Sequence, residues 1–68
     1  MSYESQYQNL RLIARRMLLE VGIIEDEDFD VKVSDMAIHI LEDLYNQQYS
    51  SREINNAIVI LKAASRPF

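Results

Sequence analysis

The sequence predicts an all-α protein, a single compact domain of three helices covering residues 1–68. Two observations lead to this prediction. The chain contains one glycine and one proline, far below typical usage, so few residues interrupt regular structure. Apolar residues also recur at intervals of three and four along most of the chain, the period of an amphipathic helix. We expect helices at about 3–21, 35–48 and 51–65, with an acidic loop at 24–33.

The first helix has the clearest pattern. Its apolar stripe repeats at spacings of four and three and consists of Tyr3, Tyr7, Leu10, Ala14, Met17 and Val21. Ser2 can cap the start, because its hydroxyl can accept a hydrogen bond from a free amide of the first turn. Gly22 can adopt the left-handed conformation that ends a helix, and Ile23 would then fold back onto Leu18 or Leu19.

Two further helices are expected in the second half of the chain. Ser34 is the expected N-cap of the helix at 35–48. Its apolar face comprises Met36, Ala37, Ile40, Leu41, Leu44 and Tyr45. Ser50 and Glu53 have the spacing of a capping box, which opens the helix at 51–65. This last helix is apolar on nearly all sides, so we expect it to be either the central helix or a dimer seam.

An alternative interpretation concerns two segments with strand character. Residues 29–33 (FDVKV) alternate between apolar and charged side chains, and residues 57–61 (AIVIL) are rich in β-branched residues. These two segments could pair as strands. The helical spacing that continues through Leu61 and Ala64 favours the all-α prediction.

The acidic stretch at 25–35 (EDEDFDVKVSD) raises the question of a calcium site. Asp26, Asp28 and Asp30 alternate as do the first ligands of an EF-hand loop. With Asp26 as position 1, however, Val31 stands where the loop needs glycine, and Ala37 stands where it needs a bidentate glutamate. We therefore predict no metal site and interpret the stretch as a solvated acidic loop.

The composition argues against an enzyme and against cofactor binding. The sequence has no cysteine, one histidine and one glycine, so it lacks the parts of a thiolate zinc site, a catalytic triad or a glycine-rich phosphate loop. His39, with Asp35 and Asp43 four residues to either side, is interpreted as a surface histidine. No signal peptide is visible, and the longest apolar run is far too short to cross a bilayer. These features predict a soluble, cytoplasmic protein with no membrane partner.

The charge distribution indicates where a partner could bind. Residues 20–43 hold nine acidic residues and one lysine, whereas bases predominate in the rest of the chain. Arginine and leucine side chains mix on the side of the first helix away from its stripe, which is typical of protein interfaces. The candidate partner-binding residues are Arg11, Leu12, Arg15, Arg16, Leu19, Val59 and Lys62. The simpler interpretation is an ordinary solvated face.

These observations predict a small acidic interaction module, such as an adaptor, inhibitor or regulatory subunit. It would bind another protein and also form a homo-oligomer through the third helix. The alternative is a small dimeric DNA-binding regulator that reads DNA with the polar side of that helix. This side comprises Arg52, Asn55, Asn56, Val59, Lys62 and Arg66. The net charge of −4 argues against DNA, because nucleic-acid-binding domains are usually basic.

Overall fold

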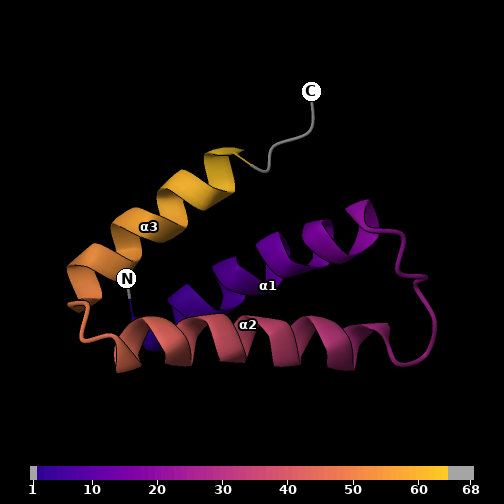
Figure 1. The fold of residues 1–68 in the computed structure, drawn as a ribbon, viewed down its shortest axis with the longest axis horizontal. Coiled ribbons are helices and arrows are strands. Elements are labelled where there is room, and N and C mark those ends of the chain that lie inside the picture. Colours follow the sequence, from indigo (N-terminus) through magenta and orange to yellow (C-terminus); the bar gives the residue numbers. More distant parts are fainter. Residues whose placement is uncertain (1, 65–68) are drawn as a thin grey trace.

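The computed structural model describes residues 2–64 and confirms the all-α, three-helix fold. The helices are α1 (Tyr3–Glu20), α2 (Phe29–Asn46) and α3 (Ser51–Ala64), and no strand occurs among the residues described. The first two helices run antiparallel and are joined by a loop at residues 21–28. The third helix starts beside the N-terminal end of α1 and diverges from the pair towards its own C-terminal end (Figure 1).

Both ends of α1 follow the sequence prediction. The Ser2 hydroxyl accepts a hydrogen bond of 3.2 Å from the amide three residues further along the chain. At the other end Gly22 has a φ of 90°, which lies in the left-handed region. The amides of Gly22 and Ile23 donate to the carbonyls of Leu19 and Leu18 at 3.1 and 2.9 Å. This pair of bonds is the Schellman motif, which satisfies two carbonyls at the helix end.

The start of α2 differs from the prediction. The helix begins at Phe29, six residues before the predicted position, with Asp28 at the N-cap, and Ser34 lies inside it. The predicted acidic loop at 24–33 is therefore helical in its second half, and the helix ends at Asn46 instead of 48. The reason is tertiary packing, which outweighs the strand preference of valine. Apolar residues spaced by four are buried along this helix, namely Phe29, Val33, Ala37 and Leu41.

The strand alternative weighed for residues 29–33 and 57–61 is wrong. Residues 29–33 belong to α2 and residues 57–61 to α3, so neither forms a strand. Asp30, Lys32 and Ser34 are all helical, which is incompatible with the open loop of an EF-hand. Within residues 2–64 no group of three or more His, Asp or Glu side chains is placed to hold a metal ion.

The start of α3 has the predicted capping box. The Ser50 amide donates to the Glu53 carboxylate at 3.1 Å, and the Glu53 amide donates to the Ser50 hydroxyl at 3.2 Å. The predicted end at 65 and the stop at 66–67 lie outside the described residues. Only Ile54 and Ile58 of this helix are buried, so α3 is not the central helix.

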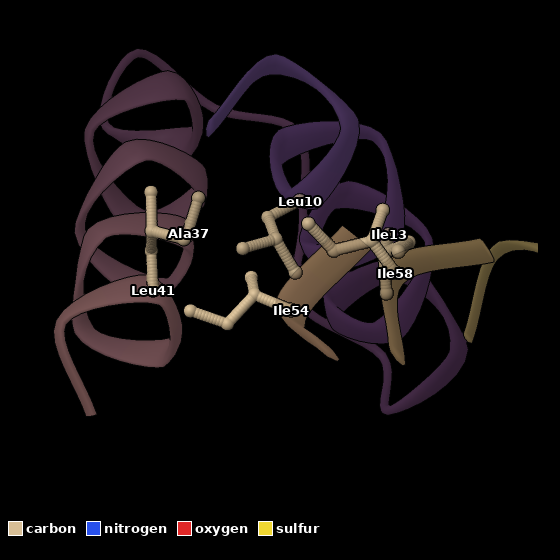
Figure 2. Packing of buried hydrophobic residues seen from close by; sticks show 6 residues of the cluster. All are labelled: Leu10, Ile13, Ala37, Leu41, Ile54 and Ile58. Carbon is tan, nitrogen blue, oxygen red and sulfur yellow. The ribbon is translucent and has the colours of Figure 1, made fainter. Parts of the chain in front are cut away.

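The core consists of two clusters with different composition. The larger one takes side chains from all three helices, and Figure 2 shows them converging: Leu10, Ile13, Ala37, Leu41, Ile54 and Ile58. We call this part of the molecule the three-helix end. The smaller cluster comprises Ala14, Phe29 and Val33, with Leu18, Ile23 and Met36 packed against it. We call it the loop end, because its residues come only from α1, the loop and α2.

A buried glutamine joins the three helices. Gln6 of α1 is fully buried. Its side-chain nitrogen donates to the Asn55 side-chain oxygen at 2.6 Å and to the Ser51 hydroxyl at 3.1 Å, both on α3. Its side-chain oxygen accepts a 2.7 Å bond from the Tyr45 hydroxyl of α2. Buried polar groups are tolerated when they are bonded in this way, and this network fixes how α3 sits on the other two helices.

Candidate functional site

The side of α1 that faces away from the core carries two exposed leucines. Leu12 is 60% exposed and Leu19 is 39% exposed. They are seven residues apart, so they lie on the same side of the helix, two turns from each other. Neither belongs to either core cluster. Leu12 and Leu19 are therefore surface residues and not partly covered members of the core.

These leucines and the neighbouring arginines line a shallow hollow. It has a volume of about 410 Å³, and its lining is Leu12, Arg15, Arg16, Leu19 and Glu20. A second hollow of about 320 Å³ shares Leu12 and Arg15 with the first. Its remaining lining residues are Gln8, Arg11, Asp30 and Val33. The structure thus brings the five predicted residues of α1 together on one continuous face.

Two arginines of this face, Arg15 and Arg16, form ion pairs with nearby glutamates. Arg15 lies 2.6 Å from the Glu25 carboxylate, and both side chains are about half exposed. The Arg15 guanidinium also lies 5.9 Å from the centre of the Phe29 ring, within cation–π range. Arg16 lies 3.8 Å from Glu20. Exposed pairs of this kind contribute about 0–1 kcal/mol, so a partner's carboxylates can replace them at little cost.

The two predicted residues of α3 lie outside this face. Val59 is exposed, and it lines neither of the hollows along α1. Lys62 donates a 3.1 Å hydrogen bond to the Asn9 side chain of α1, so it helps to attach α3. The predicted set therefore divides into a face on α1 and a separate pair on α3.

The sequence prediction missed an apolar hollow between α2 and α3. Its volume is about 430 Å³, and its lining is Leu44, Gln47, Tyr49, Glu53, Ile54, Asn56, Ala57 and Ile60. Ile60 is 68% exposed there. The apolar character of α3 on nearly all sides was the signal for such a surface. The angle at which α3 leaves α2 could not be predicted from that signal.

The polar side of α3 makes internal contacts that bear on DNA reading. Asn55 accepts the short bond from Gln6, and Lys62 donates to Asn9. Two of the six side chains considered for base or phosphate contacts are thus engaged within the domain. Arg66 lies outside the described residues. The polar side of this helix therefore offers DNA fewer side chains than its sequence indicates.

His39 lies on the exposed side of α2. Its ring nitrogen Nδ1 is 2.6 Å from the backbone carbonyl oxygen of Asp35. One ring nitrogen thus has a partner within the same helix. This arrangement agrees with the interpretation of His39 as a surface histidine.

Comparisons with protein-family models, curated proteins and solved structures give no match. Within residues 2–64, no helix is both long and apolar enough to cross a bilayer.

Proposed function

We propose that the protein is a small, non-enzymatic interaction module, an adaptor, inhibitor or regulatory subunit, that binds another protein chain. The binding face is the outward side of α1, with Leu12 and Leu19 as its apolar centre. Arg15 and Arg16 flank these leucines and would contact carboxylates of the bound chain.

The observation that carries this proposal is the exposure of Leu12 and Leu19 beside arginines in one hollow. Fully burying a leucine side chain contributes about 1.5–3 kcal/mol, and Leu12 and Leu19 would gain the share that corresponds to their exposed surface. Arginine adds bidentate hydrogen bonds to carboxylates and is enriched among the residues that dominate binding energy. The composition agrees, since it offers few of the groups that catalysis uses.

The test is a capture experiment with matched variants. Tagged wild-type protein, Leu12→Asp, Arg15→Glu and the control Ile60→Asp are each used to capture proteins from nuclease-treated lysate of the host. Circular dichroism first verifies that all four remain helical, as expected for exposed positions. The proposal expects a stoichiometric protein that wild type and Ile60→Asp retain and that the two α1 variants lose. Equal capture by wild type and both α1 variants would contradict this choice of face.

A further inference from the structure

We propose that the chain bound at the outward face of α1 is a second copy of this protein, which lays its own α2 across that face. The result is a two-fold symmetric dimer in which the two α1–α2 pairs pack face to face as a four-helix bundle. This inference rests on the proposed function and names the occupant of the same site. It differs from dimerisation through α3, which the sequence alone predicts.

The α1 half of the contact is a strip of four residues. Gln8, Leu12, Arg15 and Leu19 follow one another at spacings of four, three and four, so they line one side of the helix. Arg11 and Arg16 lie along its margins. The strip is thus apolar at two positions and has arginines around them, in a chain whose net charge is −4. Arg15 and Arg16 are paired with Glu25 and Glu20 within one copy, and aspartates of a second copy would replace these exposed partners.

The α2 half has the same spacing and the opposite charge. Val31, Ser34 and Ile38 follow one another at spacings of three and four, and the two apolar members are 59% and 37% exposed. Val31 and Ile38 are seven residues apart, as are Leu12 and Leu19. Asp30 and Asp35 lie beside them, and both are exposed.

The α1 strip and Asp30, which borders the α2 strip, lie on the same side of the α1–α2 pair. The hollow of about 320 Å³ is lined by Leu12 and Arg15 from α1 and by Asp30 and Val33 from α2, and it spans the pair. No residue of α3 lines this hollow. The third helix instead packs through Ile54 and Ile58 into the larger cluster. This side of the pair is therefore the part of the α1–α2 surface that α3 leaves open.

A two-fold axis parallel to the helices makes the two strips meet. Such an axis places α1 of one copy over α2 of the other, antiparallel, and leaves the height of each residue along the axis unchanged. Ala14 of α1 packs in one cluster with Phe29 and Val33 of α2, so Val31 lies about level with Ala14. Val31 of the other copy then falls between Leu12 and Leu19. Ile38 lies seven residues, or about 10 Å, further along, beyond Leu12 and near Gln8.

This arrangement interleaves the apolar side chains and pairs opposite charges. The four apolar residues alternate between the two copies, as knobs do in an antiparallel helix pair. Arginines of α1 face aspartates of the other copy's α2, and the same contact occurs twice because the interface is isologous. An axis perpendicular to the helices would instead set arginine against arginine and acid against acid. Charge therefore selects the first arrangement.

The α3 surface offers no such complementarity. Its hollow contains a single charged lining residue, Glu53, and no base. Two copies that meet there would gain apolar contacts alone. The open side of the α1–α2 pair provides both apolar contacts and paired charges, so it is the better site for a second copy.

The first experiment measures the mass in solution by sedimentation equilibrium over a range of protein concentrations. Wild type is expected to approach twice 8.0 kDa. Leu12→Asp is expected to raise the dimer dissociation constant about 100-fold or more, since it places an acid against the acidic strip. The matched control Ile60→Asp changes an equally exposed side chain on α3 and should leave the dimer intact.

The second experiment exchanges the charges of the two strips. One variant carries Arg11→Glu and Arg15→Glu, so that both of its strips are acidic. The other carries Asp30→Lys and Asp35→Lys, so that both are basic. Each variant alone should be a folded monomer, because like charges meet at both contacts. An equimolar mixture should form a heterodimer, because each acidic strip then meets a basic one.

Three results would overturn the dimer. A wild-type protein that stays monomeric at every concentration excludes it, and loss of a different captured protein by Leu12→Asp would still support the proposed function. A dimer broken by Ile60→Asp but not by Leu12→Asp places the interface on α3. Two folded charge variants that stay monomeric on mixing exclude the α1–α2 pairing.

Discussion

The three-helix end and the loop end of this domain both bury apolar side chains, but the first does so with three helices and the second with two helices and a loop. At the three-helix end, side chains from α1, α2 and α3 enclose one another, and Leu10, Leu41 and Ile54 are fully buried. At the loop end only two helices and a loop are present, and Met17, Val21 and Ile24 remain exposed. Met17 and Val21 continue the stripe of α1 that is buried further back. The stripe of α1 is thus fully buried at Leu10 and Ala14 and exposed at Met17 and Val21.

The two ends should therefore contribute differently to the free energy of unfolding. Two packed helices bury one stripe each, whereas a third helix turns the groove between them into an enclosed core. A domain of this size buries only about 60% of its unfolded surface, so most of its stability depends on the enclosed part. We expect the three-helix end to dominate global unfolding. The loop end should open more readily, with less effect on the rest.

The largest expected effect comes from removing a side chain at the three-helix end. Leu41→Ala deletes a fully buried side chain and leaves a cavity, which costs about 2–5 kcal/mol. In so small a domain that loss can unfold most of the protein at 25 °C. Urea unfolding followed by circular dichroism measures it. Met17→Ala, at an exposed position of the α1 stripe, is the control and should cost under about 1 kcal/mol. Equal losses would contradict the assignment of Leu41 to the core and of Met17 to the surface.

The next effect concerns the buried glutamine. Gln6→Ala leaves the Tyr45 hydroxyl and the Asn55 side chain without their bond to Gln6 and should cost about 1–3 kcal/mol. Because this network attaches α3, amide hydrogen exchange should quicken in α3 more than in the loop end. Gln8→Ala, on the exposed side of the same helix, is the control and should stay within about 0.5 kcal/mol of wild type. Uniform loss of protection in all three helices would argue against a local role.

A smaller pair of effects compares the two helix ends that adopt left-handed backbone. Gly22 at the loop end has a φ of 90°, and Gln48 at the three-helix end has a φ of 65°. A side chain in this region costs about 1–2 kcal/mol. Gly22→Ala should therefore destabilise by about 1 kcal/mol, although a Cβ would meet no atom within 4 Å. Gln48→Gly should stabilise by up to about 1 kcal/mol. Thermal unfolding tests both, and changes of the same sign would contradict the backbone explanation.

The smallest expected effect is that of the Arg15–Glu25 ion pair at the loop end. Both side chains are about half exposed, so the pair should contribute under about 1 kcal/mol. A double-mutant cycle with Arg15→Ala and Glu25→Ala measures the coupling. Adding salt should remove most of it, since exposed charges are screened. A coupling that salt does not change would contradict the interpretation of this contact as an exposed, screened ion pair.

The sequence alone determined the number of helices, both ends of α1 and the start of α3. Ser2, Gly22 and the pair Ser50 and Glu53 act through hydrogen bonds to nearby backbone, so their roles could be predicted without knowing the rest of the fold. The grouping of Arg11, Leu12, Arg15, Arg16 and Leu19 on one face is also local, because helical spacing alone places them together.

Only the tertiary structure decided where α2 begins, which partners Gln6 bonds, and where the hollow between α2 and α3 lies. Whether Phe29 and Val33 extend α2 or form a strand depended on their burial against Ala14, a contact between residues far apart in the chain. The same holds for Gln6, whose partners lie on α2 and α3, and for the hollow between those helices. Local preferences differ by a few tenths of a kcal/mol per residue, whereas burial of one large side chain contributes about 1.5–3 kcal/mol. Long-range packing therefore overrides them wherever the two conflict.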